Sequence, residues 1–131
     1  KKIPLFILTD NFTASSSEIL TGCLQHYAHQ HNTLHAFVVG MPTFGKGSVQ
    51  ELVELADGSS LKVTIARWLT PKGTSISDGG LAPDISIGRT GQQRLEDIDP
   101  QKDAAVRFLN GEAVESDPTA EELLEAEQTG E

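Results

Sequence analysis

Residues 3–19 read IPLFILTDNFTASSSEI, and this stretch decides the fold. Its first part, residues 3–9, is a compact apolar run with the pattern of a strand buried on both faces, as in a parallel sheet. Asp10 and Asn11 then break the run. Over residues 16–29, apolar side chains recur at the spacing of an amphipathic helix. The stretch therefore predicts a strand, a tight turn and a helix.

The next segments predict a second strand and a hairpin. Residues 36–40 (AFVVG) read as another short buried strand, so strand, helix and strand form a βαβ unit with a right-handed crossover. Two strand-like runs follow at residues 49–55 and 60–69, and the dipeptide Asp57-Gly58 between them is a hairpin signal. The predicted class is therefore α/β, with a βαβ core and a β-hairpin.

The remainder of the chain predicts a loop, a helix and an acidic tail. Residues 70–88 are rich in Gly, Pro, Ser and Asp, which is typical of an ordered surface loop. A short C-terminal helix is predicted over residues 100–109, with Asp99 as its N-cap. Residues 111–131 carry many carboxylates and no Lys or Arg. This composition predicts a flexible, solvated tail with a weak helix over residues 119–127.

Length and charge narrow the function classes. At 131 residues and 14.1 kDa the chain forms one folded unit, which we place at residues 1–110, before the acidic tail. The net charge of -9 argues against nucleic acid or an anionic membrane as partner, because the field repels polyanions. No apolar run approaches the roughly 20 residues that span a bilayer, so we expect no membrane insertion. The lone cysteine, Cys23, excludes an internal disulfide and gives no metal-site spacing.

Residues 40–50, GMPTFGKGSVQ, come close to a phosphate-binding loop. Such a loop needs Ser or Thr after its lysine and must open a helix, whose amides hold the phosphates. Here Gly47 follows Lys46, and the next residues are strand-like, so nucleotide binding is disfavoured. A solvent-facing lysine beside two glycines remains the plain alternative for Lys46.

The serine cluster TASSSEI at residues 13–19 lies between the first strand and the helix. A serine there is exposed at the carboxyl end of the sheet, where the helix N-terminus offers free amides and partial positive charge. A nucleophile that attacks a carbonyl needs this setting. Ser15 and Glu18 also match a capping box, in which Ser15 caps the helix and Glu18 reaches back. Both interpretations stay open at this point.

A nucleophilic serine needs a base. The four histidines crowd the far end of the helix and the loop after it, so none is well placed to serve Ser15; they are His26, His29, His31 and His35. A lysine can act as the base when burial and desolvation lower its pKa. Lys46 follows the second strand, at the same carboxyl edge as the turn that bears Ser15. Phe44 and two glycines beside it permit close approach, so the sequence predicts a Ser15/Lys46 pair.

Four ordered blocks, ASSSEI, VVGMPTFGKGSVQ, LKVTIARWLTPKG and GLAPDI, carry a resemblance over residues 3–87. They resemble the tail-specific, or carboxyl-terminal processing, serine peptidases, which have a Ser/Lys catalytic site on a ClpP/crotonase-like α/β core. The resemblance implies Ser15 as nucleophile, Lys46 as general base and Gln50 as the residue that orients Lys46. It also implies the backbone amide of Ser16 as one oxyanion donor, and a substrate groove shaped by the hairpin and the TPKG loop.

Three departures from the family pattern bear on these roles. Ser16 stands where the family usually has Ala, and Thr13 where it usually has Ser, so Ser16 and Ser17 remain alternative nucleophiles. The 31 positions between Ser15 and the lysine exceed the usual separation, and the surplus lies in the polar loop at residues 29–35. The third departure is upstream: the family's Gly-rich oxyanion segment and PDZ domain are not in this sequence.

The resemblance also sets expectations for partners and location. It implies a polypeptide substrate, recognised through its C-terminus by a PDZ domain, and an acyl-enzyme reaction that uses no cofactor, metal or nucleotide. It implies the periplasm or cell envelope, and it is compatible with an oligomer. We expect this chain to be the C-terminal part of a peptidase domain that is inactive, or nearly so, by itself. A non-catalytic peptide-binding or scaffold module on the same fold is the alternative.

Overall fold

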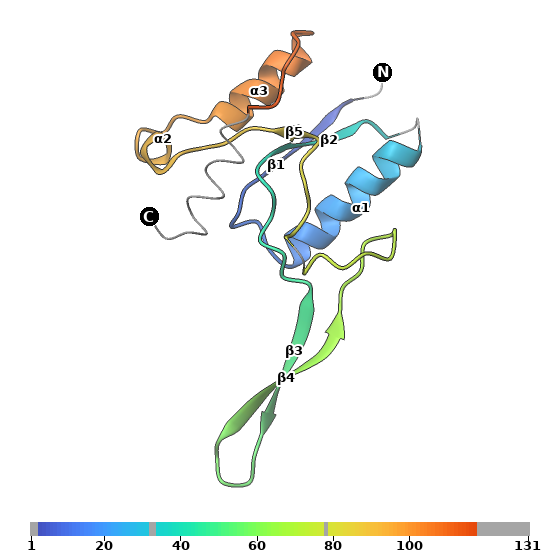
Figure 1. The fold of residues 1–131 in the computed structure, drawn as a ribbon, viewed down its shortest axis with the longest axis vertical. Coiled ribbons are helices and arrows are strands. Elements are labelled where there is room, and N and C mark those ends of the chain that lie inside the picture. Colours follow the sequence, from blue (N-terminus) through green and yellow to red (C-terminus); the bar gives the residue numbers. More distant parts are fainter. Residues whose placement is uncertain (1–2, 32–33, 78, 118–131) are drawn as a thin grey trace.

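The computed structural model describes residues 3–31, 34–77 and 79–117. Its helices and strands follow one another as Figure 1 shows. In chain order they are β1 (Leu5–Thr9), α1 (Ser16–Gln30), β2 (Ala36–Gly40), β3 (Ser48–Glu54), β4 (Ser60–Arg67), β5 (Ile85–Ser86), α2 (Gly91–Leu95) and α3 (Pro100–Leu109). The predicted strand, helix and strand, the hairpin and the C-terminal helix are confirmed, and so is the α/β class.

The main sheet is parallel and has the strand order β1-β2-β5. β1 pairs with β2 from Leu5↔Ala36 to Thr9↔Gly40, so the two strands end side by side. β5 pairs with the end of β2 through Val39↔Ile85. Because the strands are parallel, the chain leaves β1 and β2 at the same edge of the sheet. The turn that bears the serines and the loop that bears the lysine therefore start next to each other.

The prediction that β1 is buried on both faces is wrong. Leu5 and Leu8 are 42% and 41% exposed, and Thr9 is the buried residue of this strand. β1 lies at an edge of the described sheet, so no strand covers its outer side. β2 lies between β1 and β5, and its Val38 and Val39 are fully buried.

Two helices pack on this sheet. α3 contacts β1 and β2, and its Ala104 lies in the core with Val39 and Ile87. α1 also packs on β2. Val38 points to the face opposite Val39, because side chains alternate along a strand. In Figure 1, α1 and α3 lie on either side of the parallel strands.

Three aromatic rings fasten α3 to the sheet. Phe6 of β1 and Phe37 of β2 stack with their ring centroids 5.6 Å apart. Phe108 of α3 lies 5.6 Å from Phe6 and 5.1 Å from Phe37. Offset and edge-on ring pairs of this kind stabilise a fold beyond the area they bury, by about 0.5–1.5 kcal/mol each.

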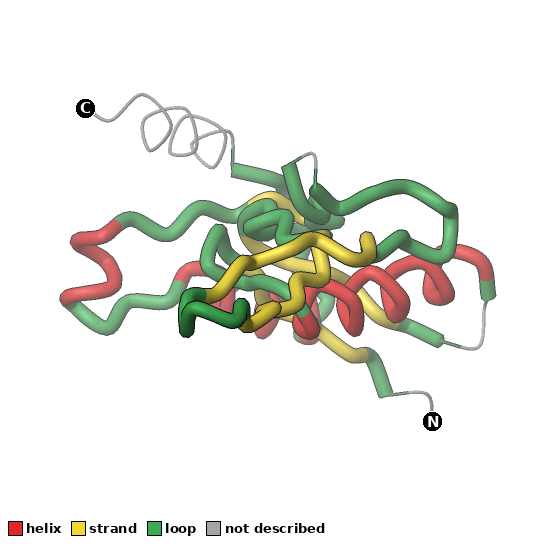
Figure 2. Tube along the Cα trace, turned by 90° about the horizontal axis from the view of Figure 1, so that it is seen from below, coloured by secondary structure: helices red, strands yellow, loops and turns green. Residues whose placement is uncertain are grey.

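The C-terminal helix begins as its sequence predicts. Asp99 is the N-cap of α3, and its carboxylate accepts a hydrogen bond of 3.0 Å from the Lys102 N–H. The short α2 was not predicted, and its N-cap Thr90 accepts from the Gln93 N–H. Figure 2 shows that α2 and the C-terminal end of α1 lie at opposite ends of the molecule. Among the described helices none is long and apolar enough to cross a bilayer.

β5 lies inside the segment predicted to be only a loop. Two residues, Ile85–Ser86, form this strand, which is too short to give a periodic signal. Part of the acidic segment contacts it: Ser116 Oγ accepts from the Ser86 N–H, and the Asp117 N–H donates to the Ser86 carbonyl. The helix predicted at residues 119–127 lies outside the described residues, as does part of the polar loop at residues 29–35. The division after residue 110 stays a prediction.

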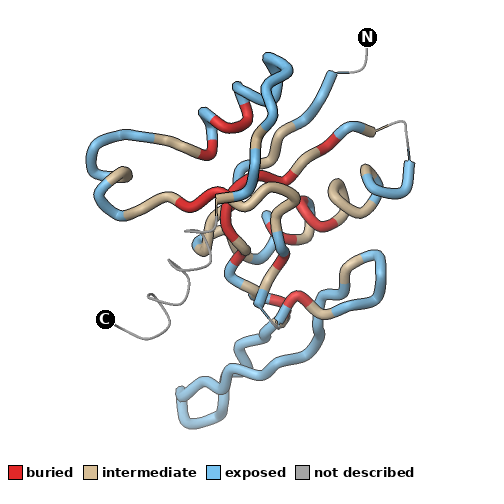
Figure 3. The backbone as a smooth tube through the Cα atoms, turned by 45° about the horizontal axis from the view of Figure 1, so that its top comes forward, coloured by how far each residue is buried: buried red, intermediate tan, exposed pale blue. Residues whose placement is uncertain are grey.

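The β3–β4 hairpin projects away from the parallel sheet (Figure 1). The strands are antiparallel, and the turn between them contains Gly58 with φ of 84°, as the Asp57-Gly58 signal predicts. A β-bulge interrupts the ladder between Val49 and Gln50. All residues of β4 are exposed, and Figure 3 shows the hairpin in the colour of exposed residues.

Candidate active site

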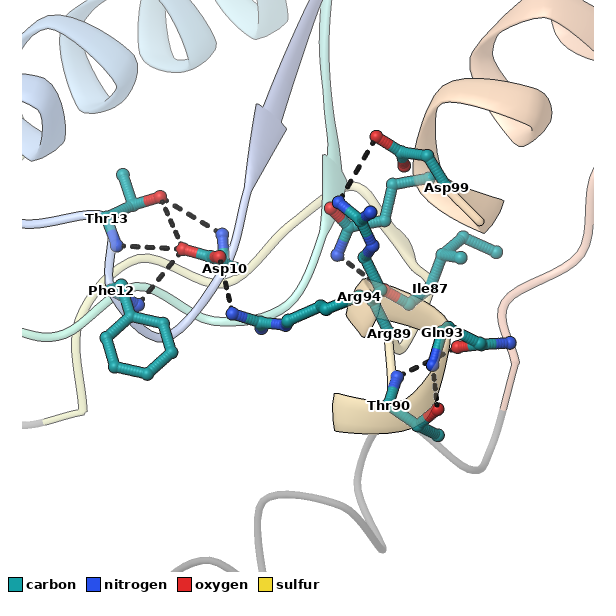
Figure 4. A network of polar contacts seen from close by, with 10 residues as sticks. Asp10, Phe12, Thr13, Ile87, Arg89, Thr90, Gln93, Arg94 and Asp99 are labelled. Carbon is teal, nitrogen blue, oxygen red and sulfur yellow. Dashed lines mark hydrogen bonds and ion pairs between the residues drawn. The ribbon is translucent and has the colours of Figure 1, made fainter. Parts of the chain in front are cut away.

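An Asp-centred turn joins β1 to α1. One carboxylate oxygen of Asp10 accepts hydrogen bonds of 3.0 Å from the Phe12 and Thr13 amides, and one of 3.2 Å from the Thr13 hydroxyl. Arg94 of α2 approaches the other oxygen at 3.5 Å, and its guanidinium lies 5.2 Å from the centroid of the Phe12 ring. Figure 4 shows these side chains around Asp10. The turn is therefore stabilised by hydrogen bonds among its own residues and by the contact of Arg94, which lies on α2, far along the chain.

Ser15 is the N-cap of α1 and has an unusual backbone conformation. Its φ is 58° and its ψ is −121°. A residue with a Cβ adopts such angles at a cost of about 1–3 kcal/mol, and such strain concentrates at functional sites. Ser15 is exposed, so its hydroxyl is accessible at the strand-to-helix turn. Ser16 is the first residue of α1, where backbone amides have no partner within the helix.

The loop after β2 carries Lys46. Its start is fixed to β1, since the Met41 N–H donates to the Thr9 carbonyl at 2.9 Å. Further along, the Phe44 N–H donates to the Thr13 carbonyl at 2.9 Å. The loop therefore runs against the turn that leads to Ser15. Gly45 has φ of 87°, and a Cβ there would meet the Ile76 carbonyl at 2.8 Å.

Glu18 joins this loop to the first turn of α1. Glu18 reaches back to the N-cap as the capping box predicts, because one of its carboxylate oxygens accepts from the Ser15 N–H at 2.8 Å, whereas the Ser15 side chain makes no cap hydrogen bond. The same oxygen accepts from the Lys46 N–H at 2.9 Å. The other oxygen accepts from the Thr43 hydroxyl at 2.5 Å and from the Gly45 N–H at 2.6 Å. The sequence pattern predicted Glu18 only as part of a helix cap. No local pattern indicated its hydrogen bonds to the loop that carries Lys46.

One open pocket of about 310 Å³ brings three of the four predicted site residues together, namely Ser15, Lys46 and Gln50. Its lining residues come from the α1 N-terminus, the lysine loop and the hairpin: Ser15, Lys46, Ser48, Val49, Gln50, Lys62 and Trp68. We call it the serine pocket. Ser16 and Ser17 are not among its lining residues, so the predicted oxyanion amide of Ser16 is not part of this pocket. Of the three neighbouring serines, Ser15 is therefore the one that shares a pocket with Lys46 and Gln50.

The described residues do not bury Lys46. The sequence-based hypothesis needs a desolvated lysine, but the Lys46 side chain is exposed and the neighbouring Phe44 is 64% exposed. That expectation is wrong for this structure. The reason is that the loop packs its backbone on Glu18 and turns both side chains outward, and no described element covers them.

The histidines lie elsewhere, as the sequence predicts. His26 and His29 line another pocket, beside Gln25 and Leu81, and His29 Nε2 lies 3.0 Å from an Asp84 carboxylate oxygen. His31 and His35 are described as well, and neither lines the serine pocket. Within the described residues, no group of three His, Cys, Asp or Glu side chains is arranged to hold a metal ion.

A small apolar pocket lies beside the serine pocket and shares Trp68 with it. Its volume is about 20 Å³. Its lining comes from α1 and from the segment after β4, and consists of Glu18, Ile19, Gly22, Cys23, Trp68, Leu69, Thr70, Pro71 and Ile76. The two pockets extend from the hairpin to the TPKG loop.

A large part of the chain matches a known protein family. The model of peptidase family S41 matches residues 1–87, which include β1, α1, β2 and the hairpin. This chain belongs to peptidase family S41. α2 and α3 lie beyond the matched residues.

The relatives are carboxyl-terminal processing proteases. The chain is 44% identical over 87 residues to carboxy-terminal processing protease CtpB of Bacillus subtilis, covering 66% of this chain and 17% of that protein. It is 47% identical over 87 residues to the chloroplastic carboxyl-terminal-processing peptidase 2 of Arabidopsis thaliana, covering 66% of this chain and 16% of that protein. The chain thus spans about a sixth of the length of these relatives.

Two solved structures are similar to this chain. The photosystem II D1 C-terminal processing protease superposes with a TM-score of 0.54 at 40% identity, over 64% of this chain and 20% of that chain. Mature CPAF superposes with a TM-score of 0.60 over 85% of this chain and 21% of that chain. Its identity of 18% supports likeness of fold alone.

Proposed function

We propose that this chain supplies the nucleophile and the general base of a serine-type, carboxyl-terminal processing endopeptidase. The observation that carries the proposal is the strained, exposed Ser15, which lines one pocket with Lys46 and Gln50. Membership of a peptidase family and relatives that are processing proteases support it. The ClpP/crotonase-like form of the core is part of the same proposal.

The reaction follows from the roles of these groups. Lys46, acting as a neutral amine, takes the proton of the Ser15 hydroxyl while Oγ attacks the carbonyl carbon of the substrate. The amide of Ser16 donates to the oxyanion that forms, at the partially positive end of α1. The Lys46 ammonium then gives its proton to the leaving amine, and an ester to Ser15 remains. Water, deprotonated by Lys46, attacks this ester, and the proton passes from Lys46 to the departing Ser15 Oγ, which restores both groups. Gln50 orients the lysine in both halves.

The exposure of the site suits a polypeptide substrate. An extended peptide along the serine pocket and the small apolar pocket would cover Lys46 and exclude water from it. The chemistry proposed needs no cofactor. We further propose that the substrate's C-terminus is recognised by a PDZ domain, that the protein acts in the periplasm or cell envelope, and that residues 1–131 alone are nearly inactive.

The second candidate is a non-catalytic module that binds peptide or serves as a scaffold. The exposed Lys46 side chain favours it, since the proposed general base needs a site that excludes water. The strained Ser15 counts against it, because a scaffold gains nothing from that conformation.

The test uses the full-length protein that carries this chain and an unfolded substrate with an apolar C-terminus. Ser15→Ala and Lys46→Ala should each lower kcat/KM by at least about 10³-fold, because nucleophile and base act as a unit. Ser17→Ala, the same change two positions along, is the matched control and should cut like the parent. Cleavage at the parental rate by both the Ser15 and the Lys46 variants would reject the proposed dyad, and absence of cleavage by the parent itself would favour the non-catalytic module.

A further inference from the structure

Glu18 is a charged residue in a place where charges are rare. It is 0% exposed, and an uncompensated carboxylate in such a position costs several kcal/mol. Hydrogen bonds compensate for the burial of the Glu18 carboxylate, since each of its two oxygens accepts two hydrogen bonds. The donors are three backbone amides and one hydroxyl, all uncharged. Glu18 is thus a buried carboxyl group whose four donors are three backbone amides and the side-chain hydroxyl of Thr43.

The donors come from the two segments that bear the proposed catalytic side chains. The Ser15 and Lys46 amides converge on one and the same oxygen, at 2.8 and 2.9 Å. A single atom therefore fixes the distance between the backbone of the nucleophile and the backbone of the base. The bond to the Ser15 N–H also holds that residue in its strained conformation.

Helix capping does not account for this arrangement. A capping box needs Glu18 to bond the Ser15 amide alone. The bonds to Gly45 and Lys46 reach 27 and 28 positions along the chain. A third segment is tied in by Thr43, whose hydroxyl donates to Glu18 and accepts from the Leu81 N–H at 2.8 Å.

We propose that Glu18 is a positioning residue of the peptidase: it sets Ser15 and Lys46 in the geometry for proton transfer without touching substrate. This inference rests on the proposed function of Ser15 and Lys46. Effective catalysis depends on reacting atoms held about 3–3.5 Å apart, and a displacement of about 1 Å can cost about 10²-fold in rate. Glu18 acts at the backbone of both residues, so its loss should affect their alignment more than substrate affinity.

The main variant is Glu18→Gln in the full-length protein. The amide keeps the size of the side chain, but its NH₂ group replaces one accepting oxygen and opposes at least one N–H donor in either orientation. We expect kcat to fall about 10- to 100-fold while KM changes less than about threefold. The rate of Ser15 labelling by a small fluorophosphonate should fall by a similar factor. Glu54→Gln, the same loss of charge on the exposed hairpin, is the control and should match the parent in both rates.

A pair of variants at Thr43 keeps the test decisive if Glu18→Gln does not fold. Thr43→Val removes the hydroxyl that donates to Glu18, and Thr43→Ser keeps it. We expect Thr43→Val to lower kcat and the labelling rate about 10-fold, and the serine variant to restore both. Equal rates for the two folded variants would overturn the positioning role.

The proposed function and the positioning role fail in different ways. Full activity of Ser15→Ala rejects the peptidase site, and the role of Glu18 falls with it. If Ser15→Ala is inactive while Glu18→Gln keeps the parental kcat and labelling rate, the site stands and the positioning role is wrong.

Discussion

The parallel sheet and the β3–β4 hairpin contain similar apolar residues, but these residues are buried in the sheet and exposed in the hairpin. In the sheet, Val38 and Val39 of β2 are fully buried between neighbouring strands and helices. In the hairpin, Leu52 is 62% exposed and Ile65 is 58% exposed, although both lie in equally regular strands. Apolar and β-branched residues favour a strand in both regions, but neighbours from elsewhere in the chain decide whether that strand is buried.

The candidate site takes residues from both regions, the buried sheet and the exposed hairpin. Ser15 and Lys46 start from the edge of the parallel sheet and are linked through Glu18. Gln50 lies on the hairpin, whose strands pair only with each other among the strands that the structure describes. A two-stranded hairpin is marginal by itself, so the position of Gln50 rests on weaker support than that of the other two residues.

One substitution made in both regions should give the largest contrast. Val39→Asp puts a carboxylate in the core beside Ile87 and Ala104, and should cost more than about 4 kcal/mol of unfolding free energy. Val53→Asp, on the hairpin at 41% exposure, should cost less than about 1 kcal/mol. Urea denaturation of the chain followed by far-UV circular dichroism measures both. Equal losses would mean that the hairpin is as integrated as the sheet.

Two glycines with similar backbone angles sharpen the comparison. Gly45 and Gly58 have φ of 87° and 84°. A Cβ at Gly58 meets nothing within 4 Å, whereas one at Gly45 meets the Ile76 carbonyl at 2.8 Å and the Gly80 amide at 2.9 Å.

Gly58→Ala should therefore lower the free energy of unfolding by about 1 kcal/mol, because only the conformational strain of a positive φ is added. Gly45→Ala should cost about 2–4 kcal/mol, because backbone atoms must also move apart. Thermal unfolding of both variants next to the parent gives the ranking. A larger loss at Gly58 would show that turn strain outweighs the crowding around the lysine loop.

Local signals explain what the sequence could predict. The helix at Ser16–Gln30, the turn at Asp57-Gly58 and the helix at Pro100–Leu109 are set by periodicity, turn residues and caps within a few positions. The residue types of the candidate site were accessible for the same reason: a serine at a strand-to-helix turn and a lysine after the next strand must meet at one sheet edge.

The features that sequence analysis missed depend on distant contacts. β5 is a strand only because Ile85 lies beside Val39. The outer side of β1 and the side chain of Lys46 are exposed because no described element covers them. The local sequence does not indicate which distant elements will lie beside a strand or a loop. The bridge made by Glu18 joins donors up to 28 positions away, and a capping motif accounts for one of them.

The smallest predicted effect concerns the turn of the hairpin, whose hydrogen bonds in the described part of the chain are made among residues 55–59. The Ser59 hydroxyl and then the Ser59 amide, which donate to the carboxylate at 2.6 and 3.0 Å, hold the pKa of Asp57 below its ordinary value. By contrast, the comparable turn at Asp10 is also contacted by Arg94 from α2. A lowered folded-state pKa means that the turn is stabilised above the unfolded pKa of about 3.9, and loses this contribution as the pH falls through the folded value.

An NMR titration of the Asp57 carboxyl carbon should therefore give a midpoint below that of an unfolded aspartate. In Ser59→Ala, which removes the larger cause and keeps the amide, the midpoint should rise part of the way back. The effect should stay within the hairpin, so Ser59→Ala should leave the amide signals of β2 at their parental positions. If they do shift, or if the Ser59 variant leaves the midpoint unchanged, the hairpin turn is coupled to the parallel sheet in a way that its contacts do not provide.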